Sequence, residues 1–132
     1  MKIIYTDKID GLTPQNLEGG FFVGWQKKVT PAQHLGILIN SYKAWVAIDE
    51  ATGNVVGFIN AISDGVLSAY IPLLEVLPTY QRQGIGKELI RLMIADLSKF
   101  YMVDVICDEN VQPFYESFGM FRHKSMILRN HE

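Results

Sequence analysis

The sequence predicts an α+β fold in which a mixed, mostly antiparallel central sheet is flanked by helices. Strand-like segments follow one another in the middle of the chain, with turn residues between them. A glycine turn then opens the best amphipathic helix of the chain, and a short apolar segment comes after that helix. Because a helical crossover joins parallel strands, this last segment adds one parallel pair to an otherwise antiparallel sheet.

The N-terminal part of the chain predicts one strand and two helices. Residues 2–6 have the composition of a short strand, and Thr13 begins a short helix. The next helix begins at Thr30, with Pro31 at its first position and Gln33 closing a capping box. His34 is expected at the surface of this helix, and one face is shared by His34, Leu35, Leu38 and Ile39.

Three strands are expected next, over residues 44–49, 55–62 and 66–77. Residues 50–54 and a later Asp-Gly pair supply the turns between them. Pro72 interrupts the third strand. Because proline cannot donate a hydrogen bond to a neighbouring strand, it indicates a bulge, an edge or a splayed pair.

The C-terminal part predicts a long helix over residues 84–100 and a buried strand over residues 101–107. A short helix is expected over residues 111–118, ended by Gly119 in the left-handed conformation. Residues 121–128 are expected to close the chain as one or two strands.

Composition limits the classes of partner. The chain has 132 residues, a net charge of −2 and no internal linker or repeat, so we expect a single domain over residues 1–132 without general attraction to nucleic acid. No apolar run reaches the roughly 18 residues that a membrane span requires. The single cysteine, Cys107, is expected in the core and favours a reducing, cytoplasmic location.

The most informative segment is the turn at residues 81–87. Gly84 and Gly86 open the long helix, and neither carries a Cβ that would hold an anion away from its first backbone N–H groups. These groups lack intrahelical acceptors and lie at the positive end of the helix dipole. A phosphorylated ligand is therefore expected here. The spacing differs from the G-x-G-x-x-G of dinucleotide-binding folds.

Gln81-Arg82-Gln83-Gly84-Ile85-Gly86 resembles the Q/R-x-x-G-x-G/A motif of the Gcn5-related N-acetyltransferase (GNAT) superfamily. Residues 108–120 resemble that family's N-x-x-A-x-x-x-Y-x-x-x-G-F region. The two motifs occur in the family's order and on the expected elements, and the resemblance covers essentially the whole chain. It implies the GNAT fold and acetyl-CoA as the acetyl donor.

The resemblance also implies where coenzyme A would bind. Its pyrophosphate would lie on the glycine turn, its pantetheine arm would pair with the preceding strand, and its sulfur would lie beside Phe114 and Tyr115. Asp108 holds the family's asparagine position and Asn110 comes two residues later; either can cap the last helix. The implied contacts are Val76, Leu77, Arg82, Gln83, Gly84, Ile85, Gly86, Lys87, Asp108, Asn110 and Phe114.

Acetyl transfer to an amine needs a base for the amine, a donor for the developing oxyanion and a proton for the departing thiolate. Tyr115 is the candidate acid; alternatively, its ring only packs against the cofactor. Glu75 is the candidate base, since its apolar neighbours would raise its pKa, although pairing with an arginine or a backbone donor fits equally well. Asp64, Asp104 and a water relay are the other possibilities for the base.

The acceptor pocket is expected at Phe21, Phe22, Trp25 and Tyr70, in the region that forms the variable substrate wall in the family. The alternative is an aromatic loop packed on the core or in a dimer face. Asp64 either reaches the acceptor or serves its own turn. No His, Cys, Asp or Glu residues occur at metal-ligand spacing, so no metal is expected.

The resulting hypothesis is an N-acetyltransferase that moves acetyl from acetyl-CoA to a primary amine, a small molecule rather than a protein, by direct attack in a ternary complex. Two alternatives remain open: a domain that binds or senses acetyl-CoA without turnover, and a non-enzymatic protein-interaction module. Nucleic acid and membranes are not expected as partners, and a homodimer fits the family resemblance.

Overall fold

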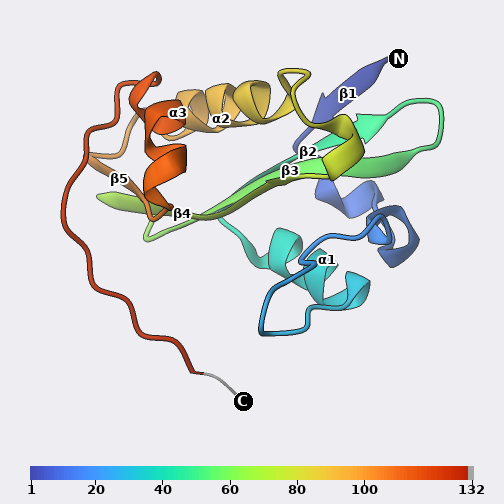
Figure 1. The fold of residues 1–132 in the computed structure, drawn as a ribbon, viewed down its shortest axis with the longest axis horizontal. Coiled ribbons are helices and arrows are strands. Elements are labelled where there is room, and N and C mark those ends of the chain that lie inside the picture. Colours follow the sequence, from blue (N-terminus) through green and yellow to red (C-terminus); the bar gives the residue numbers. More distant parts are fainter. Residues whose placement is uncertain (131–132) are drawn as a thin grey trace.

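The fold, obtained as a computed structural model that describes residues 1–130, is built on a five-stranded sheet (Figure 1). The strands lie in the order β1-β2-β3-β4-β5, and all pairs are antiparallel except the parallel pair β4–β5. This arrangement confirms the predicted α+β class. The strand bounds are β1 (Ile3–Thr6), β2 (Lys43–Asp49), β3 (Asn54–Ser63), β4 (Ser68–Val76) and β5 (Met102–Val105).

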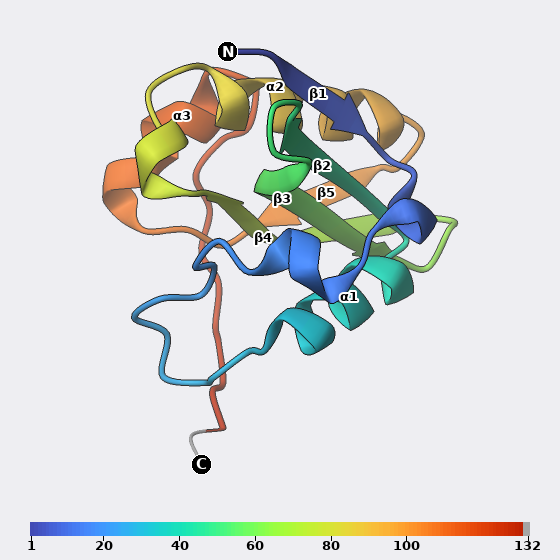
Figure 2. The same ribbon diagram turned by 90° about the vertical axis from the view of Figure 1, so that its right-hand side faces the viewer.

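Helices cover both faces of the sheet. Figures 1 and 2 show α2 (Ile85–Asp96) and α3 (Gln112–Glu116) on one face and α1 (Pro31–Asn40) on the other. The capping box of α1 is present as predicted, because the Thr30 hydroxyl accepts a hydrogen bond from Gln33 N and the Gln33 side chain accepts one from Thr30 N. The short 3-10 turns are η1 (Ile9–Gly11), η2 (Pro14–Leu17), η3 (Pro78–Tyr80) and η4 (Glu109–Val111).

Pro72 marks a change in how β4 is paired. On the β3 side, the register shifts between Asn60 and Ile62, opposite the proline, so the predicted bulge is confirmed. On the β5 side, pairing runs only from Ser68 to Ile71 and stops before Pro72. The second half of β4 therefore has β3 as its sole strand neighbour within residues 1–130, and β4 and β5 part.

The core lies on both sides of β3, in which residues 55–61 are all buried. Gly57 lets α2 approach this strand closely: a Cβ at position 57 would lie 3.1 Å from Ile85 Cγ2 and 3.3 Å from Leu89 Cδ1. The start of α2 is thus held against the sheet by packing, since interiors are close-packed and have little room for an added methyl group.

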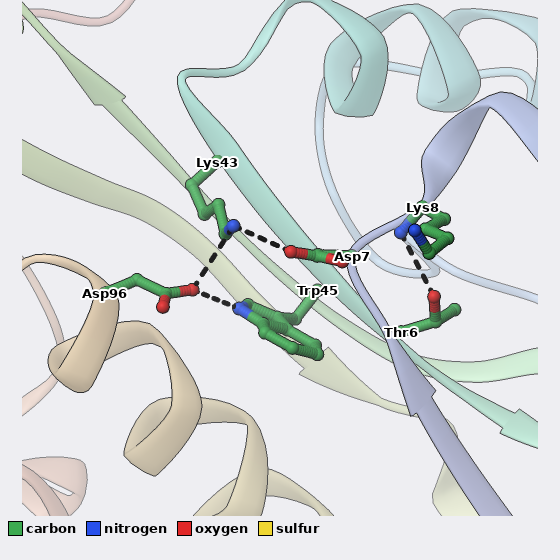
Figure 3. Close-up of polar contacts among 6 residues, drawn as sticks. All are labelled: Thr6, Asp7, Lys8, Lys43, Trp45 and Asp96. Atoms are coloured by element: carbon green, nitrogen blue, oxygen red, sulfur yellow. Dashed lines mark hydrogen bonds and ion pairs between the residues drawn. The ribbon is translucent and has the colours of Figure 1, made fainter.

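Polar contacts hold the opposite end of α2 (Figure 3). Asp96 Oδ2 accepts a hydrogen bond of 2.7 Å from Trp45 Nε1 and lies 3.5 Å from Lys43 Nζ. Lys43 Nζ also lies 2.7 Å from Asp7 Oδ2, just beyond β1. We call Asp7, Lys43, Trp45 and Asp96 the polar cluster; it joins α2 to the first two strands.

Several expectations for the elements were wrong. His34 is buried, with 1% of its surface exposed, whereas Ile39, expected on the same face, is 59% exposed. Helix α2 ends at Asp96 rather than at residue 100. Strand β5, expected to be buried, is an edge strand with alternate residues exposed, because nothing within residues 1–130 pairs with its outer side.

The C-terminal segment also differs from its prediction. Residues 121–130 form no strand; the segment passes alongside the body of the protein, and only its end extends beyond it (Figures 1 and 2). The last helix is shorter than the predicted 111–118, because α3 ends at Glu116 with Ser117 as its C-cap. Gly119, with φ of 91°, has the predicted left-handed conformation but lies three residues beyond the helix. Side-chain pattern alone predicted a strand, but a strand also needs a partner to pair with.

Candidate active site

The glycine turn ends in an open helix terminus. Gly84 is the N-cap of α2, with φ of 84°, and no side chain caps the helix there. The first intrahelical hydrogen bond joins Glu88 N to Gly84 O, at 3.0 Å. The backbone N–H groups of residues 85–87 therefore have no acceptor within the helix. Arg82, with φ of 64°, is also left-handed, as in the concave backbone turns that bind anions.

Space for a ligand lies beside both glycines. A Cβ on Gly84 would meet no atom within 4 Å, and one on Gly86 would lie 3.7 Å from Val76 Cγ2. The first turn of α2 thus sits directly beside the end of β4. A phosphate at this terminus would meet several N–H donors and the positive end of the helix dipole.

Contacts that the sequence analysis missed hold the turn in place. The Tyr80 hydroxyl donates to Asp49 Oδ2 at 2.7 Å, which fixes η3 against the β2–β3 turn. This hydrogen bond lowers the pKa of the Asp49 carboxyl, with help from Ala51 N. Gln81 Nε2 donates to Val76 O at 2.9 Å. Tyr80 and Asp49 are 31 positions apart in sequence, and no local pattern links them.

The end of β4 presents one backbone N–H to the gap between β4 and β5. Leu77 N donates to Val56 O at 2.8 Å, so it points toward β3. Backbone groups alternate in direction along a strand, and the N–H of Val76 therefore points toward the gap. Both backbone polar groups of Leu77 are already engaged, because Leu77 O also accepts from Tyr80 N at 2.9 Å.

Glu75 lies on the opposite face of the sheet from Val76. Its two carboxylate oxygens accept from Phe22 N at 3.2 and 3.3 Å, so the backbone-donor reading of this residue holds, with no arginine involved. Burial raises the pKa of the Glu75 carboxyl, and the hydrogen bond from Phe22 opposes that rise. Phe22 adopts φ of 66°, a strained conformation for an aromatic residue, which aims its N–H at the carboxylate.

The aromatic segment near Glu75 packs largely into the core. Phe21 and Phe22 are each less than 9% exposed and surround the ring of His34, whereas Trp25 is 51% exposed and lies against Phe22 at 5.2 Å between ring centres. Burial lowers the pKa of His34 to about 4. A small cavity of about 180 Å³ opens beside Phe21, Phe22 and His34.

On the α3 side, a larger cleft of about 790 Å³ runs along β5. Its lining includes Tyr115, Cys107 and Tyr70. Tyr115 is buried, and desolvation raises the pKa of its hydroxyl to about 12, so the phenol is protonated at neutral pH. Phe114 packs edge-on against Tyr115, with 5.1 Å between ring centres. Cys107 is half-buried: it packs against the core and also lines this cleft.

Comparison with known proteins assigns the chain to a family. The model of the Acetyltransferase (GNAT) family matches residues 14–120, most of the chain. This protein belongs to the GNAT family. The match includes the glycine turn, Glu75 and Tyr115, and it stops where the extended C-terminal segment begins.

Individual relatives agree with the family. The chain is similar to a proposed acetyltransferase from Deinococcus radiodurans R1, whose crystal structure superposes with a TM-score of 0.92. The two sequences are 42% identical, and the alignment covers 98% of this chain and 89% of the other. GCN5-related N-acetyltransferase 3, chloroplastic, from Arabidopsis thaliana is 37% identical over 56% of this chain. An uncharacterised N-acetyltransferase from Pyropia yezoensis is 26% identical over 76%. This chain spans only 32% and 59% of those two relatives.

Other predicted site residues of this GNAT chain lie apart from the glycine turn. Asp64 accepts from the backbone N–H groups of residues 66–68, which lowers the pKa of its carboxyl and shows that it serves its own turn. Asp104, expected in a buried strand, is exposed, and Asp108 and Asn110 are exposed at η4. Neither of the last two caps α3, whose N-cap position is Val111, without a side-chain hydrogen bond.

Two kinds of feature are absent from residues 1–130. No group of three or more His, Cys, Asp or Glu side chains there is arranged to hold a metal ion. None of the helices in that range is both long and apolar enough to cross a membrane.

Proposed function

We propose that this GNAT protein transfers acetyl from acetyl-CoA to the primary amine of a small molecule, by direct attack in a ternary complex. The observation that carries the proposal is the open N-terminus of α2 beside the gap between β4 and β5, with Glu75 on one face of the sheet and Tyr115 in the cleft on the α3 side. A donor and an acceptor can approach such a gap from opposite faces.

The donor would be held mainly by backbone groups. We assign its pyrophosphate to the N–H groups at Gly84, Ile85, Gly86 and Lys87, where the helix dipole favours an anion. Arg82 and Gln83 stand at the same turn and supply polar side chains to it. The pantetheine arm would pair with Val76, in the manner of an added strand. Asp108, Asn110 and Phe114 remain predicted contacts on the α3 side.

The donor supplies the acetyl group as a thioester; transfer forms a C–N bond, breaks the C–S bond and releases a thiol. Glu75 accepts the amine proton, directly or through water, and its raised pKa makes it a better base than an ordinary carboxylate. The N–H of Val76 points into the gap and donates to the developing oxyanion. Tyr115 holds the proton that the departing sulfur takes up.

A small amine fits the surroundings of Glu75 better than a folded protein does. The cavity beside Phe21 and Phe22 has a volume of only about 180 Å³. The exposed ring of Trp25 can bind a cationic amine through a cation–π contact. The Glu75 carboxylate also favours a positively charged acceptor. Tyr70 lines the cleft, on β4, one residue before Ile71, the last β4 residue that pairs with β5.

The test is a thiol-release assay with acetyl-CoA and a panel of primary amines, run on the wild type and on Tyr115→Phe. We expect at least one amine to be acetylated, and we expect Tyr115→Phe to lower kcat by about 100-fold or more, since positioned acids contribute on the order of 10²–10⁴. The KM for acetyl-CoA should change little.

Equal losses in kcat and in acetyl-CoA affinity would instead assign Tyr115 a binding role. Tight acetyl-CoA binding with no amine acetylated would contradict the proposed turnover and favour a sensing domain. Failure to bind acetyl-CoA at all would contradict both readings.

A further inference from the structure

The imidazole of His34 has no polar partner in the described part of the chain. Of the buried side-chain atoms of residues 1–130 that can form hydrogen bonds, three have no partner: both ring nitrogens of His34 and Oδ1 of Asn60. Asn60 still donates one hydrogen bond through its amide nitrogen, at 3.0 Å, whereas the His34 ring forms none. Phenylalanine rings surround this imidazole, and the nearest is that of Phe58, with 4.3 Å between ring centres.

Such a histidine costs folding free energy, because its polar atoms lose water and gain no partner in the protein. Burial lowers the pKa of His34 to about 4, so the ring is neutral at pH 7. A neutral imidazole has one N–H donor and one lone-pair acceptor. Both remain unused after folding, as is typical of positions where stability is given up for function.

The same side chain lines a cavity. His34, Phe21 and Phe22 belong to the lining of the cavity of about 180 Å³ on the α1 side of the sheet. Glu18, which is exposed, is the one carboxylate among the described residues of that lining, and they include no lysine or arginine. This combination suits a hydrogen-bond donor, above all a cationic one, and disfavours an anion. Both His34 nitrogens are covered in the free protein, so binding also requires a small turn of the ring or of its aromatic neighbours.

Phe22 connects this cavity with the proposed catalytic base. Its N–H donates to Glu75 at 3.2 Å, and its ring centre lies 5.0 Å from that of His34. Because a single residue contacts both groups, a ligand only a few carbon atoms long can extend from Glu75 into the cavity. The two ends of such a ligand would meet different chemistry: a carboxylate with a raised pKa at one end and a neutral imidazole at the other.

We propose that His34 selects the acceptor by accepting a hydrogen bond from a second polar group at the far end of the amine. The acceptor is then a short primary amine that carries an ammonium or a hydroxyl group at its other end, and Glu18 favours the ammonium of a diamine. A site with a buried polar atom discriminates strongly against an analogue that leaves this atom unpaired. The nature of the reaction rests on the proposed acetyl transfer, whereas the binding site does not.

Three amines of matched length test the selection: 1,4-diaminobutane, 4-amino-1-butanol and pentylamine, whose terminal methyl group cannot donate. We expect kcat/KM of the wild type to be at least tenfold higher for each of the two polar amines than for pentylamine. His34→Leu should lose this preference and still acetylate pentylamine. His34→Gln, whose amide keeps a donor and an acceptor, should retain part of the preference. An unchanged preference in His34→Leu would overturn the proposal.

Two variants serve as controls. Asn60→Ala removes the other unpartnered buried atom, but Asn60 lines neither of the two cavities described above, so the preference should stay as in the wild type. Glu18→Gln should lower only the advantage of the diamine over the amino alcohol. Thermal unfolding checks that each variant is folded, and we expect Tm of His34→Leu at or above that of the wild type, because an apolar side chain replaces two unpaired nitrogens.

A binding measurement separates this site from acetyl transfer. In the double variant His123→Gln/His131→Gln, His34 is the only histidine, so its isotope-labelled ring can be followed by NMR during a titration with 1,4-diaminobutane, with and without coenzyme A. We expect saturable shifts of the ring-nitrogen signals. Shifts without acetylation of any amine would support the site and contradict the proposed transfer. Acetylation of the diamine with unshifted His34 signals would support the transfer and overturn the site, and neither shifts nor acetylation would contradict both.

Discussion

The two ends of α2 are finished in opposite ways. At the C-terminal end, Asp96 accepts from Trp45 and lies near Lys43, which in turn pairs with Asp7, so the polar cluster ties the helix to β1 and β2 (Figure 3). At the N-terminal end, Gly84 has no side-chain cap, and the turn before it is left-handed at Arg82. One end is closed by the chain's own polar groups, and the other is left open.

This difference separates stability from binding along a single helix. A glycine at the N-cap gives up only about a few tenths of a kcal/mol relative to a capping side chain. The polar cluster and the packing of Ile85 and Leu89 on Gly57 hold α2 in place without such a cap. Open donors on a fixed helix are preorganised for an anion, which lowers the cost of ordering them on binding.

Gly86→Glu should show the largest effect, at the open end. Its carboxylate would repel a pyrophosphate and fill the space beside the first turn, so we expect acetyl-CoA affinity to fall at least 100-fold by calorimetry. Stability should not fall, because the new Cβ makes an ordinary contact with Val76 and glutamate suits the first helical turn better than glycine.

Gly36→Glu is the control for that variant, because a Cβ at Gly36 on α1 meets nothing within 4 Å. It makes the same chemical change in a helix away from the turn and should leave acetyl-CoA affinity unchanged. If Gly86→Glu bound acetyl-CoA as tightly as the wild type, the N-terminal end of α2 would not be part of the binding site.

Asp96→Ala breaks the closed end. Removing this carboxylate leaves Trp45 Nε1 and Lys43 without their shared acceptor, and because the site is partly exposed we expect a loss of about 1 kcal/mol. Thermal unfolding should show Tm lowered by about 3–6 °C. Acetyl-CoA affinity should stay within twofold. A large loss of affinity would mean that the two ends are coupled.

Arg82→Ala is a milder change at the open end. Arg82 is exposed, so its charge is screened by salt and we expect only about a threefold loss of acetyl-CoA affinity at low ionic strength. The loss should shrink further as salt is added. A salt-independent loss would indicate that the backbone turn itself, left-handed at this residue, had changed shape.

The smallest effect concerns acid stability at the closed end. The hydrogen bond from Lys43 lowers the pKa of the Asp7 carboxyl in the folded protein. A carboxyl with a lowered folded pKa contributes stability above its unfolded pKa, about 3.9, and that contribution is lost as pH falls through the folded value. Asp7→Asn should therefore be less stable than the wild type at pH 7 and should converge with it in acid, as followed by urea unfolding.

Features predictable from the sequence were those set by neighbouring residues. Thr30 and Gln33 are three residues apart, and this spacing predicts a capping box. The two glycines at 84 and 86 predict a helix terminus without a side-chain cap. Pro72 predicted the bulge in the same way, because its missing backbone N–H depends on that residue alone. The order of these local signals was sufficient for the fold class.

Features that escaped prediction depend on residues far apart. The hydrogen bond from Phe22 N to Glu75 joins residues 53 positions apart in sequence, and that from Tyr80 to Asp49 joins residues 31 positions apart. No periodicity in the sequence indicates such pairs. His34 was misplaced because a histidine on a helix is usually exposed, whereas here three phenylalanine rings enclose it. Residues 121–128 were predicted to form one or two strands from their side chains, but nothing within residues 1–130 pairs with them.

The central claim is that the open N–H groups at the start of α2 bind the pyrophosphate of the donor. The most direct test is a titration of isotope-labelled protein with coenzyme A, followed by amide resonances in two-dimensional NMR. We expect the largest shifts at the amides of Gly84, Ile85, Gly86 and Lys87, with little change at the other end of α2 near Asp96. Saturable binding that leaves those four amides unshifted would contradict it.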